Sequence, residues 1–277
     1  MTLAKIDDLK KMANQIRIDT IDQVYQAKSG HPGGSLSAAD LLAALYFYKL
    51  NVKPEMPQWE DRDRFILSKG HASPAYYSAL ARKGFFSADR LVNFRSVKDY
   101  LEGAPSIKLE GVDMSAGPLG QGMSVAVGMA LGGRLQKKQF KTYCMVGDGE
   151  MQEGQIWEAL MTAAKYRLGN LIGILDNNHI QMCGTNDCVM PLGDISAKLT
   201  AFGWKVINID GHNMHRIVDA LNEIDDNPEG LPTMIIANTV KGKGVSFMED
   251  THKWHGAVPT DEQYAAAMKE LGGGSNE

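Results

Sequence analysis

The sequence has few cysteines, no long apolar run and no dense basic cluster, and each of these absences excludes a class of protein. Its three cysteines, Cys144, Cys183 and Cys188, form no CxxC pair and are odd in number. We therefore expect free thiols in a reducing cytoplasm. No apolar run approaches the length of a membrane span, and the first residues lack the apolar core of a signal peptide.

The charge balance gives no support to nucleic-acid binding. Lysine and arginine number 29 against 33 aspartate and glutamate, which gives a net charge of −4. With 44% hydrophobic and 22% charged residues, the composition is that of an ordinary globular protein. The length of 277 residues allows one large α/β domain or two small ones, and buries a substantial core.

Two apolar runs in the middle of the chain end in polar residues. The run over 143–146 leads to Asp148 within Gly-Asp-Gly, and the run over 171–175 leads to Asn178. Residues 154–168 between them are good helix formers with apolar residues at helical spacing, so a strand–helix–strand unit with parallel strands is predicted. Because ligands bind at the carboxyl ends of such strands, we expect Asp148 and Asn178 to lie close together.

These two side chains, with a main-chain carbonyl, offer hard oxygen ligands. One carboxylate, one amide and one carbonyl oxygen suit Mg²⁺ or Ca²⁺ that carries a phosphorylated ligand, and the set does not choose between the two ions. A bare Gly-Asp-Gly is also ordinary turn chemistry. The asparagine thirty positions after Asp148 is what favours a ligand site over a plain turn.

Three glycine-rich stretches carry further candidate residues. His31 lies among three glycines and a proline, where the backbone can approach a ligand, although a plain loop between helices is the alternative. His71 follows an expected strand over 64–68. Residues 117–122 lead into a helix over 123–137, and their glycines would let main-chain N–H groups face a ligand. Ser35 is expected to cap a helix that runs through Tyr48.

The whole pattern predicts an α/β fold with one domain over residues 1–271. The expected sheet is mostly parallel and twisted with helices on both faces, and residues 272–277 are expected to form a disordered tail. Further strands are expected over 205–209 and 233–238. Further helices are expected over 2–28, 74–82, 87–95, 195–202, 214–225 and 260–271. Residues 96–116 and 181–194 are expected to be loops.

The order of these motifs resembles the transketolase family. The stretch from Asp148 to Asn178 resembles its thiamine diphosphate-binding motif, and four other stretches fall in family order. They are Ser29-Gly30-His31-Pro32-Gly33, Lys69-Gly70-His71, Gly117-Pro118-Leu119-Gly120-Gln121-Gly122 and His255-Gly256. The resemblance covers nearly the whole chain. It implies a thiamine diphosphate enzyme that moves a two-carbon ketol unit from a ketose to an aldose.

The resemblance also implies roles for individual residues. Metal ligands would be Asp148, Asn178 and the main-chain carbonyl of Ile180. Cofactor contacts would come from His71, Gly117, Pro118, Leu119, Gly147, Asp148, Gly149, Glu150, Asn178 and His255. His31 and His255 would act on the substrate, since histidine can donate or accept a proton near neutral pH. Glu153 would be a carboxylate at the subunit interface that links two active sites.

In two respects the chain departs from the family. A full-length transketolase is more than twice this size, and the parts with the activating glutamate, the stacking aromatic residues and the sugar-phosphate arginines have no counterpart here. The resemblance therefore implies the N-terminal subunit of a split transketolase, with a separate C-terminal partner and two copies of each chain. Secondly, Ala104 replaces a family histidine that contacts the donor, which suggests a branched or sulfonated donor instead of xylulose 5-phosphate.

Three alternatives stand beside this interpretation. The α subunit of a 2-oxo acid dehydrogenase shares the metal motif but lacks the other stretches in this form. A 1-deoxyxylulose phosphate synthase would be one long chain. A non-catalytic cofactor-binding module is the alternative outside the enzymes. Against it stands the presence of the five candidate residues Asp148, Asn178, His31, His71 and His255, which a degenerate site would not need.

Overall fold

The apolar runs form the strands of one parallel sheet. In the computed structural model, which describes residues 3–272, the strands are β1 (Arg64–Leu67), β2 (Thr142–Gly147), β3 (Leu171–Asn177), β4 (Lys205–Asp210) and β5 (Thr233–Asn238). Their order is β1-β2-β3-β5-β4, and every neighbouring pair is parallel. The predicted α/β class is confirmed, and all five strands lie where they were predicted to within two residues.

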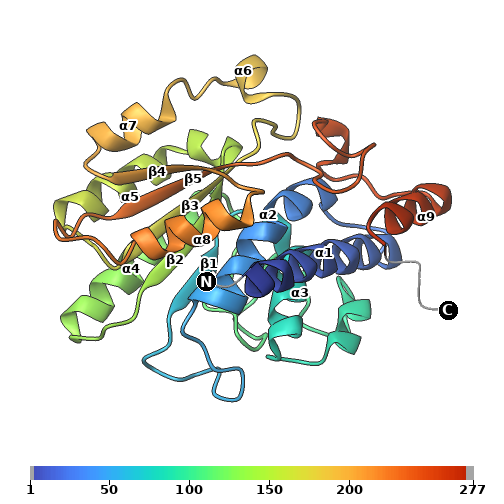
Figure 1. The fold of residues 1–277 in the computed structure, drawn as a ribbon, viewed down its shortest axis with the longest axis horizontal. Coiled ribbons are helices and arrows are strands. Elements are labelled where there is room, and N and C mark those ends of the chain that lie inside the picture. The colour runs from blue at the N-terminus through green and yellow to red at the C-terminus, as the bar shows by residue number, and fades with distance from the viewer. Residues whose placement is uncertain (1–2, 273–277) are drawn as a thin grey trace.

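Helices cover both faces of this sheet (Figure 1). They are α1 (Leu3–Gln26), α2 (Pro32–Ala44), α3 (Ser73–Lys83), α4 (Gln121–Leu135), α5 (Gly154–Lys165), α6 (Asn186–Val189), α7 (Ile195–Ala201), α8 (Met214–Glu223) and α9 (Asp261–Glu270). Alternate strand residues face opposite cores. Tyr143 and Met145 of β2 pack with α1, α2, α3 and α8, whereas Cys144 and Val146 pack with α4 and α5.

The first and last helices of the described chain pack together. Helix α9 lies beside α1 in Figure 1, although the two come from opposite ends of the sequence. The rings of Tyr25 and Tyr264 stack with centroids 4.0 Å apart, and the Tyr264 hydroxyl donates to Asp22. A capping box on Thr260 starts α9. This contact closes the C-terminal segment back onto the N-terminal helix.

Helix α2 begins three residues before the position expected from Ser35. Pro32 occupies the first turn, where a missing N–H costs nothing, so the helix starts directly after His31. The Ser35 hydroxyl donates to the His31 carbonyl at 2.8 Å instead of capping the helix. The expected helix end at Tyr48 is close, because a π-helical turn over Leu45–Lys49 continues α2. His31 is thereby held at a helix start and not in a free loop.

Residues 96–116 contain no helix or strand, as expected, but they are pinned to α3. The Tyr77 hydroxyl lies within hydrogen-bond distance of the carbonyls of Glu102 (2.9 Å) and Ala104 (3.1 Å). Ser73 donates to the carbonyl of Gly103 at 3.0 Å. The expected 181–194 loop holds one short helix, α6, which the sequence pattern missed. Of the expected tail, residues 273–277 lie outside the described residues.

A buried ion pair joins the segments at the carboxyl edge of the sheet. The ammonium of Lys69, just after β1, pairs with Asp176 near the end of β3, and both side chains are almost fully buried. Asp176 also accepts from Ser37 of α2 at 2.6 Å and from Thr239 after β5. No helix in the described part of the chain is long and apolar enough to cross a membrane.

Breaking this ion pair should cost far more stability than breaking an exposed one. Lys69→Met leaves the Asp176 carboxylate buried without its cation, which should lower the free energy of unfolding by about 3–5 kcal/mol. Urea unfolding followed by circular dichroism measures it. Lys10→Met is the control, because its partner Asp7 is 3.4 Å away on the surface. Equal losses in the two variants would contradict the central role of the pair.

Candidate functional site

A cavity of about 420 Å³ opens at the carboxyl ends of the strands. Its lining comes from segments that follow β1, β2, β3 and β5, so the sheet topology brings together residues far apart in sequence. The described residues that line it are Gly34, Lys69, His71, Gly117, Leu119, Gly147, Asp148, Gly149, Glu150, Gln152, Glu153, Asn178, Ile180, Gln181, Met182, Lys241 and His255. Asp148 and Asn178 both lie there, as predicted from their places at strand ends.

The three predicted metal ligands lie on one wall of the cavity. Asp148 accepts from the N–H groups of Gly149, at 2.8 Å, and of His179. The amide oxygen of Asn178 accepts from the N–H of Ile180 at 3.2 Å. His179 has a φ of +63°, a left-handed conformation that turns the chain sharply between Asn178 and Ile180. One carboxylate, one amide and one carbonyl oxygen are thus available on this wall, which fits a hard divalent cation.

The electrostatics of this wall favour a bound cation. Burial and the nearby charge of Asp176 raise the pKa of Asp148 above its ordinary value, although two main-chain N–H groups oppose the shift. A buried carboxylate with a raised pKa lacks a sufficient positive partner. A divalent ion at Asp148 would supply that charge. Within the described residues no cluster of three or more histidine, cysteine, aspartate and glutamate side chains could hold a metal.

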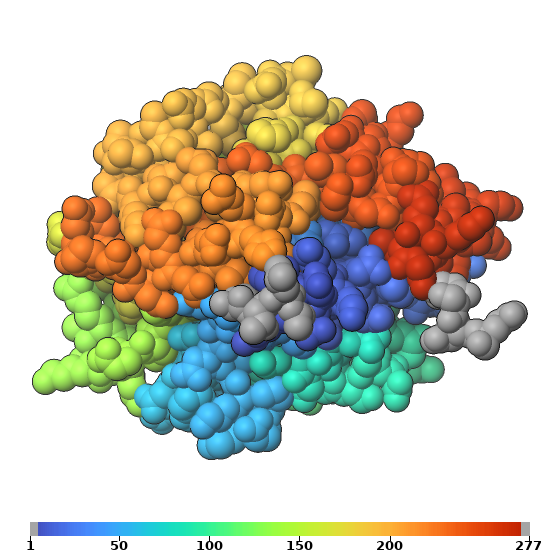
Figure 2. All heavy atoms as spheres, in the orientation of Figure 1, coloured from blue at the N-terminus to red at the C-terminus, as the bar shows by residue number. Residues whose placement is uncertain are grey.

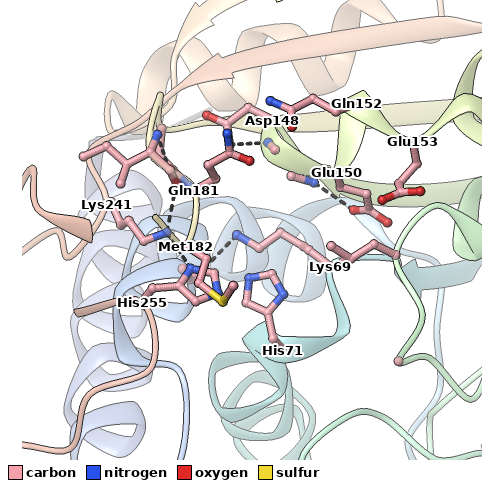
Figure 3. Close-up of a pocket in the computed structure, with 17 residues that line it drawn as sticks. Lys69, His71, Asp148, Glu150, Gln152, Glu153, Gln181, Met182, Lys241 and His255 are labelled. Carbon is pink, nitrogen blue, oxygen red and sulfur yellow. Dashed lines mark hydrogen bonds between the residues drawn. The ribbon is translucent and has the colours of Figure 1, made fainter. Parts of the chain in front are cut away.

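Two lysines that were not predicted as site residues reach the cavity. Figure 3 shows the side chains of Lys69 and Lys241 running toward each other from opposite sides. The Lys241 ammonium donates to the carbonyl of Ile180 at 2.9 Å and lies 2.9 Å from Nδ1 of His255. Burial, with the charge of Lys69, lowers the pKa of Lys241 to about 8. Two buried ammonium groups suit an anionic ligand such as a diphosphate.

The signal for these lysines was weak in the sequence. Both lie in short Lys-Gly segments directly after strands, where a side chain can reach the ligand edge of the sheet. Surface lysines in glycine-rich loops are far more common than buried ones. Only the packing shows that Lys241 is 2% exposed and Lys69 is 1% exposed.

Three histidines predicted as site residues form one cluster. The ring centroids of His31 lie 5.5 Å from His71 and 5.4 Å from His255, and those of His71 and His255 lie 5.1 Å apart. His71 and His255 line the cavity, whereas His31 lies behind them. The buried Nδ1 of His31 has no hydrogen-bond partner among the described residues. The cluster therefore brings together the candidate proton carriers that the resemblance implies.

All three imidazoles are held in the neutral form. Burial, helped by nearby lysine charge, lowers the pKa of His255 to about 3 and that of His71 well below its ordinary value. Burial and the charges of Arg95 and Lys241 also lower the pKa of His31. Each ring can then accept a proton at one nitrogen and donate from the other near pH 7.

The predicted glycine-rich stretch forms a further part of the wall. Gly117 and Leu119 line the cavity, but Pro118 is not among its lining residues. Glu150 fixes this stretch: its Oε1 accepts from Ser68, at 2.5 Å, and from the N–H of Gly120, at 2.8 Å. Its Oε2 accepts from the N–H of Gly147 at 3.0 Å. The predicted cofactor contact Glu150 thus uses its carboxylate to join three segments of the wall.

One side of the cavity is open to solvent. Glu153, the predicted interface carboxylate, is exposed at its edge, with Leu119 (39% exposed) and Met182 (66% exposed) nearby in the lining. Figure 3 shows Glu153 on the opposite side of the view from Lys241 and His255. In the space-filling view, the segments after β3 (yellow) and after β5 (orange-red) lie side by side (Figure 2). The chain therefore encloses only part of a ligand.

Comparisons with known proteins agree with this arrangement. The family model described as transketolase, thiamine diphosphate binding domain, matches residues 8–277. One of the two subunits of the apulose-4-phosphate transketolase of Phocaeicola vulgatus is 42% identical over 270 residues, which cover 96% of this chain and 95% of the relative. The 6-deoxy-6-sulfo-D-fructose transketolase subunit SqwG of Clostridium sp. is 43% identical over 265 residues, which cover 95% of this chain and 96% of the relative.

Similarity to a solved transketolase extends to the fold. The transketolase of Campylobacter jejuni superposes with a TM-score of 0.90 at 34% identity. That match covers 98% of this chain but only 43% of the Campylobacter chain. The chain thus spans less than half of that longer protein and almost the whole of the two subunit relatives.

The buried histidines should make stability depend on pH in a defined direction. In the unfolded chain His71 titrates near its ordinary pKa of 6.5, but in the folded chain it stays neutral. The unfolded state then binds more protons, so stability is lost as the pH falls below about 6.5, by at most about 1.4 kcal/mol per pH unit for one histidine.

Urea unfolding of the wild type and His71→Asn at pH 7 and at about pH 5 tests this dependence. The variant lacks the titrating ring, so its stability should fall less on acidification than that of the wild type. His215→Asn is the control, because His215 is exposed on α8. Parallel losses in the wild type and His71→Asn would contradict the assignment of a neutral buried His71.

Proposed function

The chain belongs to the transketolase family, and we propose that it is the N-terminal subunit of a split transketolase. It would transfer a two-carbon ketol unit from a ketose donor to an aldose acceptor, together with a separate C-terminal chain. The match over nearly the full length of two transketolase subunits carries this proposal, since longer transketolases are matched over less than half. The open side of the cavity supports it, because a second chain has room to complete the site.

The residues present fit thiamine diphosphate and its metal. Asp148, Asn178 and the carbonyl of Ile180 would hold Mg²⁺, or Ca²⁺, against the diphosphate. Lys241 and Lys69 would balance the remaining negative charge from the other side. The predicted contacts from His71, Gly117, Leu119, Gly147, Gly149, Glu150 and His255 all line the same cavity.

The catalytic work of this chain would be proton transfer and positioning. When bound, thiamine diphosphate supplies the electron sink for breaking and making the carbon–carbon bond. His31 and His255 lie in one cluster of neutral rings, so either can take a proton from a substrate hydroxyl or return one. Glu153, exposed at the open edge, would meet a neighbouring chain of the enzyme and connect two sites.

Assembly and location follow from the same proposal. Two copies of this chain and two of the C-terminal partner would form the enzyme, which would act in the cytoplasm on sugars of the pentose phosphate type. The exposed apolar side chains Leu119 and Met182 at the open edge support a partner there, because soluble proteins rarely leave such groups at a site without a function.

The donor is proposed to differ from xylulose 5-phosphate. Ala104 lies beside the β1 end of the site: a Cβ placed on Gly70 would be 3.5 Å from the Cβ of Ala104. Its methyl group can neither donate nor accept a hydrogen bond, whereas the family histidine can. The two similar subunits are named for apulose 4-phosphate and for 6-deoxy-6-sulfo-D-fructose. A branched or sulfonated ketose is the proposed donor class.

Reconstitution tests the proposed function. The chain alone, the candidate C-terminal chain alone and their mixture would be assayed for ketol transfer with thiamine diphosphate and Mg²⁺. Activity is expected only in the mixture, because this chain encloses only part of the ligand. Asp148→Ala in the mixture should abolish activity by removing the metal carboxylate. Substantial activity of the single chain would contradict the split arrangement, and cofactor binding without activity in the mixture would favour a non-catalytic module.

Ala104→His should shift donor preference toward xylulose 5-phosphate. The new ring restores one hydrogen bond to the donor, which is worth about 1 kcal/mol, or about fivefold in kcat/KM relative to a branched or sulfonated ketose. Ala104→Leu is the matched control, because it adds bulk without a polar group and should not favour xylulose 5-phosphate. An unchanged ratio of the two donors in Ala104→His would count against a role of this position in donor choice.

A further inference from the structure

The segment after β5 carries Lys241 into the cavity, and its main chain is held at successive residues. The N–H of Thr239 donates to the carbonyl of Asn177 at 3.1 Å. The N–H of Gly242 donates to the carbonyl of Gly33 in the first turn of α2 at 3.0 Å. Between them, the N–H of Val240 donates to a side chain, Nε2 of His212, at 2.8 Å. The residue next to Lys241 is thus fixed by an imidazole.

The contacts of His212 determine its protonation state. Because Nε2 accepts from a main-chain N–H, this nitrogen carries no proton. The proton of the neutral ring is then on Nδ1, which lies 2.7 Å from Oδ2 of Asp40 in α2. The ring therefore donates to Asp40 and accepts from Val240 at the same time. Glutamine or asparagine, in one side-chain conformation, can reproduce only one of these two bonds with the right atoms.

The carboxylate of Asp40 is anchored in turn. Arg17 of α1 forms a buried ion pair with it, and the side chains of both residues are 9% exposed. Burial raises the pKa of Asp40, but the bond from His212 and the charge of Arg17 outweigh this and keep the pKa below its ordinary value. The acceptor of the His212 proton is therefore a fixed anion, which orients the ring.

These contacts form a continuous series from the helical layer to the cavity. Arg17 of α1 holds Asp40 of α2, Asp40 holds His212 after β4, and His212 holds Val240 after β5. Arg17, Asp40 and His212 lie outside the set of described residues that line the cavity. The side chain of Lys241 has little freedom of its own, since a Cβ on Gly33 would be 3.1 Å from its Cγ. Its backbone position therefore decides where its ammonium lies.

We propose that His212 is a positioning residue, which in its neutral, Nδ1-protonated form fixes Lys241 through the main chain of Val240. If Val240 loses this acceptor, a buried N–H is left without a partner, and the segment shifts to find one. The Lys241 ammonium then leaves its place beside the Ile180 carbonyl and His255. Only the identity of the ligand that Lys241 faces, a diphosphate, rests on the function proposed above.

Charged groups face His212 from several elements. Asp40 and Arg17 approach from α2 and α1, Glu249 contributes from the loop after β5, and Oδ1 of Asp210 accepts from the His212 N–H at 2.9 Å. A second proton on the ring would place an N–H against the N–H of Val240, and the two donors would repel. The neutral ring is therefore the form that holds Val240.

Two variants of His212 separate its two bonds. His212→Asn keeps a donor near the Nδ1 position for Asp40 but removes the acceptor for Val240. His212→Gln places an amide oxygen near the Nε2 position, where it can accept from Val240. We expect His212→Asn to weaken binding of thiamine diphosphate in Mg²⁺ by about tenfold, and His212→Gln to recover most of that loss. His215→Asn, an exposed histidine on the adjacent helix, is the control and should leave binding unchanged.

A double-mutant cycle with Lys241→Met identifies the route of the effect. If His212 acts through Lys241, His212→Asn should change the dissociation constant of thiamine diphosphate little in the Lys241→Met background. Calorimetry on the full chain with its partner measures all four proteins. Equal tenfold losses in both backgrounds would overturn the proposal and leave His212 as a general stabilising residue.

Two further measurements do not depend on cofactor binding. Nitrogen-15 spectra of the histidine rings should show His212 as protonated at Nδ1 and unprotonated at Nε2 at neutral pH. Reductive methylation followed by mass spectrometry should modify Lys241 several-fold faster in His212→Asn than in the wild type or His212→Gln. If the wild type fails to bind thiamine diphosphate, the proposed function fails. An unchanged Lys241 rate in His212→Asn would overturn the positioning role.

Discussion

The buried carboxylate of Asp176 is the interaction on which the site depends. It accepts from Lys69 after β1, Ser37 in α2 and Thr239 after β5, so one anion joins three segments around the end of β3. Burying a charge without partners is costly, and this cost is offset only while all donors stay in place. The geometry of the cavity is therefore tied to the stability of the domain.

The charges around the cavity are arranged for a ligand that carries both signs. Asp148 lacks a sufficient cation, and Lys241 lacks a sufficient anion, as their opposite pKa shifts indicate. A diphosphate with a divalent metal supplies both, with the metal toward the Asp148 wall and phosphate oxygens toward the lysines. The protein therefore keeps two uncompensated groups in a partly closed pocket, and a ligand of this kind would stabilise the folded state.

Local patterns predicted the strands and the strand-end residues, but not the residues that reach the site by long-range packing. The apolar runs before Asp148 and Asn178 indicate strand type and direction, and parallel topology then brings the ends together. The start of α2 was misplaced, because Pro32 competes with Ser35 as a helix-start signal. Lys241 and His212 were missed as site residues, since their contacts join segments that no sequence spacing relates. The function came from motif order, not from periodicity.

An open site also explains why a transketolase can be divided between chains. The contacts that shape the diphosphate end, from Asp176 to Glu150 and from Arg17 to His212, all lie within this one domain. None of these contacts needs a residue from a second chain. The open edge instead carries Glu153 and exposed apolar groups such as Met182, which a partner can cover without rearranging the anchored wall. A division at this boundary therefore separates two halves of a site and leaves the internal hydrogen bonds of this half intact.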